Sequence, residues 1–198
     1  MEKLQRNERI SILQRIFCDS PGKVFSLGDF TELLGCAKSS VSEDIDIIRG
    51  SLEKSGVGAI ETITGASGGV RYLPLSSGEN ALRLAEGLCR ELSRKERILP
   101  GGYLYMMDII YDPGLVSEIG RVFAGSFYSK GVDYVITVET KGIPIAFITA
   151  KYLNVPLVIV RHYNEAMDGA SVNISYVSGS SKRMQTMVLP LHSLKRNS

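Results

Sequence analysis

Thr140, Lys141 and Gly142 have the residue types and the spacing to bind an anion such as a phosphate. They follow an apolar run, VDYVITV over 132–138, and precede a helical pattern over roughly 143–153. A turn from a strand into a helix offers free backbone N–H groups at the positive end of the helix dipole, and Lys141 adds charge. An ordinary strand–helix connection has the same pattern, and neither GxxxxGK[ST] nor GxGxxG occurs.

The sequence contains no pattern typical of a disulfide, a metal site or a catalytic nucleophile. Cys18, Cys36 and Cys89 are scattered and form no CxxC pair, which predicts buried thiols of a reduced, cytoplasmic protein. His162 and His192 have neither Cys nor His near them, so we expect no metal site. Both histidines also lie away from any nucleophile, so no catalytic residue is assigned.

The 198 residues, 44% of them hydrophobic, suffice for one large domain or two small ones. Apolar runs such as IPIAFITA over 143–150 fall short of the ~18 residues that a membrane span needs. The charged N-terminus is not followed by a signal-peptide core, so nothing indicates export.

Three helices and a hairpin are predicted at the front of the chain. Helical spacing indicates a helix over roughly 4–18, and Ser26 with Asp29 forms an N-cap pattern for a second. A third, over 40–55, is expected to begin with a capping box of Ser40 and Glu43. Two short β-type runs then flank a glycine-rich turn at 65–69. The pattern is typical of a winged helix-turn-helix, whose third helix enters the major groove of DNA.

Charge alone does not decide whether this front module binds DNA. Residues 1–75 hold nine Lys/Arg and ten Asp/Glu, but the basic residues cluster before most of the acids. The start of the third helix carries Lys and Ser beside free backbone N–H groups, which attract phosphate. A plain interaction module is the alternative. The predicted DNA-binding residues are Lys3, Arg6, Lys38, Ser39, Ser40, Ser42 and Arg71.

The third helix carries three acidic residues whose roles have to be considered. Glu43 could accept a hydrogen bond from a cytosine, or could be the reciprocal half of the capping box. Asp44 and Asp46 point in different directions because they are two residues apart on a helix, so they make a poor catalytic pair. Both are expected to be solvated.

The remaining chain predicts a parallel α/β unit. Residues 76–80, SSGEN, look like a linker, and Asp112-Pro113 starts a helix whose apolar side carries Val116, Ile119, Phe123 and Phe127. Two nearly all-apolar strands, 132–138 and 155–160, flank a helix, as in a buried βαβ unit. Runs at 171–177 and 184–190 form an antiparallel hairpin. The predicted domains are 1–75 and 76–198.

Several motifs together resemble the bacterial purine operon repressor (PurR) family of the Gram-positive type. The resemblance spans nearly the whole chain. It is carried by AKSSVSEDIDIIR (37–49), TGASGGVRYLP (64–74), ERILPGGYLY (96–105), TKGIPIA (140–146), YLNVPLVIVR (152–161) and ISYVSGSSKRMQTM (174–187).

The resemblance implies a winged helix joined to a type I phosphoribosyltransferase-like domain that acts in regulation. It implies a dimer that represses purine genes and needs no cofactor. Phosphoribosyl pyrophosphate (PRPP), with or without Mg²⁺, would loosen its hold on operator DNA. Residues 139–143 then correspond to the pyrophosphate loop, and 161–185 to a hairpin over the site. The implied ligand residues are Tyr103, Glu139, Thr140, Lys141, Gly142, Lys182 and Arg183.

The sequence departs from that family at one motif. A type I site needs a further strand, two adjacent acidic residues and a glycine-rich, Thr-ended loop, and this chain stops at KRNS (195–198) without them. We therefore expect a domain that is incomplete at its C-terminus, from a truncated or partial chain. An active purine phosphoribosyltransferase with an accessory DNA-binding domain, a fragment that no ligand controls, and a guanosine polyphosphate as the effector are the alternatives.

Overall fold

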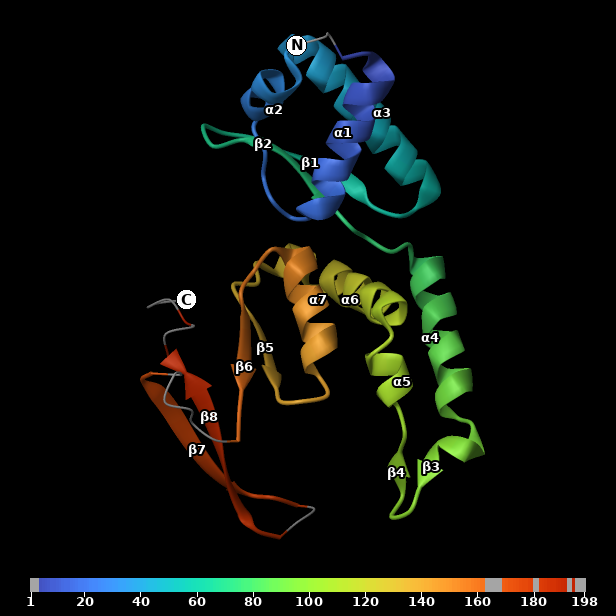
Figure 1. The fold of residues 1–198 in the computed structure, drawn as a ribbon, viewed down its shortest axis with the longest axis vertical. Helices are drawn as coiled ribbons and strands as arrows, with labels where there is room; N and C mark the ends of the chain where they lie inside the picture. Colours follow the sequence, from blue (N-terminus) through green and yellow to red (C-terminus); the bar gives the residue numbers. More distant parts are fainter. Residues whose placement is uncertain (1–3, 163–168, 180–181, 192–193, 195–198) are drawn as a thin grey trace.

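The computed structural model describes residues 4–162, 169–179, 182–191 and 194. Figure 1 shows a front module of three helices and a hairpin at one end of the molecule, and a rear module with all the other elements. One extended segment joins the last strand of the front module to the first helix of the rear module.

The front module has the predicted winged helix-turn-helix arrangement. Its elements are α1 (Arg6–Asp19), α2 (Leu27–Leu34), α3 (Lys38–Ser55), β1 (Ala59–Ile63) and β2 (Gly69–Leu73). The three helices surround one core, and β1 and β2 pair antiparallel as the wing. Left-handed Gly35 ends α2 and permits its short connection to α3, and left-handed Gly56 ends α3 before β1.

The core of the front module is apolar and closely packed. The rings of Phe17 and Phe30 meet edge to face with their centroids 5.5 Å apart. Each fully buried side chain of this size stabilises the fold by about 1.5–3 kcal/mol. The segment before α2 joins the wing, because Phe25 and Val70 exchange backbone hydrogen bonds of 2.9 Å. At Gly69 a Cβ atom would lie 2.1 Å from the Phe25 carbonyl oxygen, so only glycine fits there.

The predicted start of α3 is wrong by two residues. The helix begins at Lys38, Ala37 occupies the N-cap position, and no side chain caps it. Ser40 therefore lies inside the first turn and forms no capping box with Glu43. The side chain of Glu43 instead pairs with Arg6 of α1. The sequence pattern misled because a Ser three residues before a Glu also occurs by chance within helices.

Two other expectations about burial are wrong. Asp44 is fully buried and not solvated, since it accepts hydrogen bonds from Arg9 and Arg6. Cys18 and Cys89 are exposed, whereas Cys36 is half-buried and packs against the core of the front module.

The rear module begins at a capped helix. The side chain of Ser77 accepts from the backbone N–H of Asn80 at 3.2 Å, so α4 (Gly78–Leu92) starts within the predicted linker 76–80. The following elements are η1 (Lys95–Arg97), β3 (Ile98–Leu99), β4 (Tyr103–Leu104), α5 (Met107–Ile110), α6 (Pro113–Phe127) and η2 (Tyr128–Lys130). As predicted, Asp112 caps α6 and Pro113 opens it.

The predicted βαβ topology is confirmed, whereas its predicted burial is wrong, since Ile136 and Val138 are exposed. Strand β5 (Val135–Val138) pairs in parallel with β6 (Leu157–Val160), and α7 (Ile143–Leu153) connects them. Helices α6 and α7 pack closely at Gly120, which has no side chain to separate them. A Cβ atom there would lie 2.5 Å from the side chain of Ile148. The apolar side of α6 is only partly covered: Val116 is buried, whereas Phe123 and Phe127 are exposed.

The last two strands form the predicted antiparallel hairpin. Strands β7 (Ser171–Val177) and β8 (Met184–Pro190) pair along their length, and Arg161 after β6 bridges to Val188 of β8. Figure 1 shows this hairpin extending away from the βαβ unit, on the side opposite to α4. No described helix combines the length and apolar character that crossing a membrane requires.

Candidate DNA interface and effector site

The first two turns of α3 present a polar surface to solvent. Lys38, Ser39 and Ser42 are exposed, and Ser40 is half-buried beside the core residue Val41. The first turn holds no acidic residue, so its free N–H groups and Lys38 form a locally positive end. This is the arrangement that a phosphate contact needs.

A buried ionic cluster ties α3 to α1. Arg9 donates from Nε to Oδ2 of Asp44 at 2.7 Å and from Nη2 to Oδ1 at 3.2 Å. Arg6 reaches Oδ1 of the same carboxylate at 3.3 Å and Glu43 at 2.5 Å. The Asp44 hydrogen bond is the main cause that raises the pKa of Arg9. Arg6 is thus already paired, although half of its side chain remains exposed. Lys3, the other N-terminal residue predicted to bind DNA, lies outside the described residues.

A second polar cluster joins the wing to the rear module. Tyr128 of η2 donates to Oε2 of Glu61 on β1 at 2.7 Å, and Arg71 on β2 donates from Nε to the same oxygen at 2.7 Å. The Arg71 guanidinium also lies over the Tyr128 ring, 4.8 Å from its centroid. We call these three residues the wing contact. In this structure Arg71 faces the rear module, so the predicted Arg71–DNA contact would require it to leave Tyr128.

The wing contact shifts two pKa values. Hydrogen bonds from Tyr128 and Arg71 lower the pKa of Glu61, despite its partial burial. Burial and the bond to Glu61 raise the pKa of Tyr128 to about 12. Sequence reasoning missed this contact, because Glu61 and Tyr128 are 67 positions apart and no local pattern connects them.

The predicted anion loop lies where β5 ends and α7 begins. Thr140, Lys141 and Gly142 are exposed, and no side chain caps α7. Pro144 has no N–H and the N–H of Ile143 bonds to the Thr140 carbonyl oxygen, so the N–H groups available to an anion are those of the loop before the helix. Gly142 is confined, because a Cβ atom there would lie 2.6 Å from Oγ1 of Thr137. Glu139 is half-buried, and its Oε1 accepts from the backbone N–H of His162 at 2.7 Å, which ties the loop to the end of β6.

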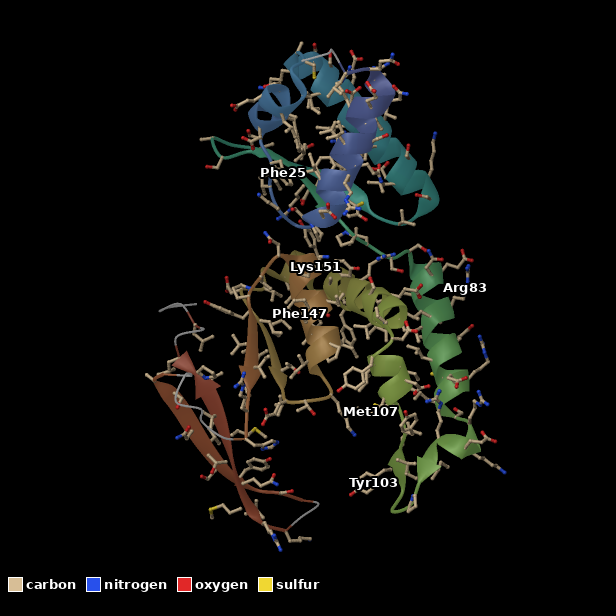
Figure 2. The ribbon with its side chains drawn as sticks, in the orientation of Figure 1. Phe25, Arg83, Tyr103, Met107, Phe147 and Lys151 are labelled. Atoms are coloured by element: carbon tan, nitrogen blue, oxygen red, sulfur yellow. The ribbon has the colours of Figure 1, made fainter. Side chains whose placement is uncertain are left out.

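The structure brings Tyr103 and Lys141 to one cavity of about 510 Å³. The hairpin of β3 and β4 supplies most of the lining, with Met107 of α5 completing it. Figure 2 shows Tyr103 on the hairpin and Met107 at the start of α5. Lys182 and Arg183 do not line this cavity; they are exposed at the turn between β7 and β8.

A buried arginine holds the hairpin that carries Tyr103. Arg97 is 8% exposed and donates to Glu91, to Asp108 and to the carbonyl oxygen of Tyr105. Its hydrogen bonds lower the pKa values of Glu91 and Asp108. No local sequence pattern indicated this cluster, since its acids lie 6 and 11 positions from Arg97 in opposite directions. Among the described residues, no three His, Cys, Asp or Glu side chains gather as metal ligands.

Comparison of the sequence with known proteins identifies the family of this chain. Residues 5–74 match the family described as "Bacterial purine repressor, N-terminal". The purine biosynthesis transcriptional repressor PurR of Bacillus subtilis is 44% identical over 196 residues, across 99% of this chain and 69% of the relative. The chain belongs to the PurR family. A PurR relative from Lactococcus lactis, named a transcriptional activator, is 40% identical across 96% of this chain and 70% of its own length.

Part of the chain is also similar to enzymes. A xanthine phosphoribosyltransferase of Clostridium novyi is 36% identical over 84 residues, covering 37% of this chain and 44% of the enzyme. Among solved structures, adenine phosphoribosyltransferase from Rhodothermus marinus aligns with a TM-score of 0.48 and 16% identity, over 60% of this chain and 66% of that one. For this PurR-family chain, the winged helix and the parallel βαβ unit confirm the predicted fold class.

Proposed function

We propose that this chain regulates transcription of purine biosynthesis genes by binding operator DNA through its winged helix. The observation that carries the proposal is the 44% identity to PurR of Bacillus subtilis along 99% of the chain. The exposed Lys and Ser residues at the start of α3 supply a surface of the right chemistry. As a regulator of bacterial promoters, the protein would act in the cytoplasm.

Repression is the proposed direction of control, and two PurR relatives are named for opposite directions. A reporter gene behind a purine biosynthesis promoter separates them. Repression predicts that reporter output rises when the gene for this chain is deleted. A fall in output would identify an activator.

We further propose that the rear module senses PRPP without turning it over. Support comes from the free N–H groups before α7, from Lys141, and from the cavity that Lys141 shares with Tyr103. These groups suit the pyrophosphate of PRPP, and Mg²⁺ would be held chiefly by the ligand's own phosphates. Because a ligand shifts an equilibrium only through unequal affinity for two states, PRPP must bind the DNA-free form more tightly.

Titration of PRPP into the DNA complex tests this part. Fluorescence anisotropy of a labelled promoter duplex should fall as PRPP is added. Lys141→Ala should leave DNA affinity unchanged and require a higher PRPP concentration, whereas Lys95→Ala, an exposed lysine of the same module, should match the wild type. A complex that ignores PRPP would refute sensing, and release by a guanosine polyphosphate alone would identify a different effector.

An active purine phosphoribosyltransferase is the second candidate, favoured by the similarity to xanthine phosphoribosyltransferases. Incubation of the chain with PRPP and a purine base distinguishes the two. The regulatory proposal predicts no nucleotide product above a protein-free control. Detectable product would establish an enzyme.

A homodimer is the proposed assembly. Phe123, Phe127 and Ile136 are exposed apolar side chains on the rear module, and such patches often mark protein interfaces. Sedimentation equilibrium of the full chain should give twice the 21.7 kDa protomer mass. A single species at the protomer mass would exclude the dimer.

A further inference from the structure

Glu43 is an exposed carboxylate on the surface that α3 presents to solvent. It is the sixth residue of the helix and lies one turn beyond Ser39, on the same face as Ser39 and Ser42. Its side chain is 65% exposed. An acid at this place is unexpected, because phosphates repel a carboxylate near DNA.

The ordinary structural reasons for an acid here are weak. Glu43 takes no part in an N-cap, since the helix begins at Lys38 and no side chain caps it. It lies beyond the first turn, where the helix dipole gives little stabilisation. Its pairing with Arg6 is not needed to join α1 and α3, because the fully buried Asp44 already makes that connection through Arg9 and Arg6.

The pairing has a different effect on the carboxylate. Arg6 Nη2 contacts Oε2 of Glu43 at 2.5 Å, which offsets its charge and restricts its rotamers. Oε1 has no hydrogen bond among those identified within the described residues. A carboxylate held in this way keeps an acceptor oxygen available and repels DNA less than a free one.

We propose that Glu43 determines base specificity by accepting a hydrogen bond from the N4 amino group of a cytosine in the major groove. This rests on the proposed DNA-binding function. Residues near the start of a recognition helix reach base edges, and Glu or Asp accepting from cytosine N4 is a recurrent contact. Arg6 acts as a positioning residue, and Lys38 and the N-terminal N–H groups contact phosphate.

Selection from a random duplex pool, followed by sequencing, tests the assignment without a known operator. The wild-type chain should enrich a motif with a C·G pair at one position of each half-site. Glu43→Ala should reduce the enrichment of cytosine over the other bases at that position by about 5- to 10-fold, since one good base contact discriminates by roughly that factor or more. Glu43→Gln should shift the preference from cytosine toward adenine, which pairs with an amide.

The matched control is Glu53→Gln, an exposed acid ten residues further along the same helix with no predicted base contact. It should reproduce the wild-type motif. If Glu43→Ala and Glu43→Gln also reproduce that motif, Glu43 does not read bases and the inference fails. If the wild-type chain enriches no sequence at all, the proposed DNA-binding function fails instead. Circular dichroism of each variant should match the wild type, because the Asp44 cluster is intact.

Discussion

Substitution of Asp44 by alanine should strongly destabilise the front module. The carboxylate is 0% exposed and accepts three hydrogen bonds from two arginines of α1. Without it, Arg9 would keep its charge with a side chain only 12% exposed. Removing one partner of a buried ion pair costs about 3–5 kcal/mol, most of it from the charge left behind.

Two further variants test whether the buried charge causes this loss of stability. Asp44→Asn retains the shape and one acceptor but places an amide donor against Arg9, so we expect about 1–3 kcal/mol. Asp19→Ala removes an ion pair of 2.6 Å between side chains that are 57% and 78% exposed. Exposed pairs contribute about 0–1 kcal/mol, so this variant serves as the control.

Urea unfolding of the full chain, followed by circular dichroism at 222 nm, measures the difference. With a slope near 2 kcal/mol per molar urea, Asp44→Ala should lower the midpoint of the affected transition by about 1.5–2.5 M. The control should shift it by less than about 0.5 M. If Asp44→Ala shifts the midpoint no more than Asp19→Ala does, the buried cluster does not anchor α3.

Two other predictions follow from exposed contacts. Lys38→Ala should weaken binding to every duplex alike and reduce the slope of log K against log salt by about 0.9, one phosphate contact; an unchanged slope would show that Lys38 does not touch the backbone. Tyr128→Phe should remove a stabilising contribution that is complete below pH 10 and is lost as pH rises toward about 12, because folding raises the Tyr128 pKa from 10.0 to about 12. The difference in urea midpoint between wild type and Tyr128→Phe should therefore shrink over that range, and a constant difference would contradict the assigned hydrogen bond.

The sequence predicted the elements well where the signals were local. Helix ends were marked by Gly35, Gly56 and the Asp112-Pro113 pair, which act through the backbone of their own turn. The nearly all-apolar strands and the helix between them predicted the parallel pair β5–β6, because such runs are typical of parallel strands. The burial that usually accompanies them was wrongly predicted for β5, whose Ile136 and Val138 are exposed. Alternation predicted the β7–β8 hairpin in the same way.

Contacts between distant residues were beyond the reach of sequence patterns. The burial of Asp44 depends on Arg9, 35 positions away, and the wing contact depends on Tyr128, 67 positions from Glu61. The candidate site residues show the same difference between local and distant signals. The anion loop could be predicted because its residues are consecutive, and its anion binding stays a prediction. The cavity that Lys141 shares with Tyr103 is visible only in the three-dimensional arrangement. The predicted ligand contacts of Lys182 and Arg183 remain predictions.

An anisotropy titration of this chain against two labelled duplexes at low ionic strength tests the central claim most directly. One duplex carries a purine biosynthesis promoter, and the other has the same base composition in scrambled order. The account predicts a complex with the promoter at a much lower protein concentration, and release of that complex by added PRPP. Equal affinity for the two duplexes, or binding to neither, would contradict it.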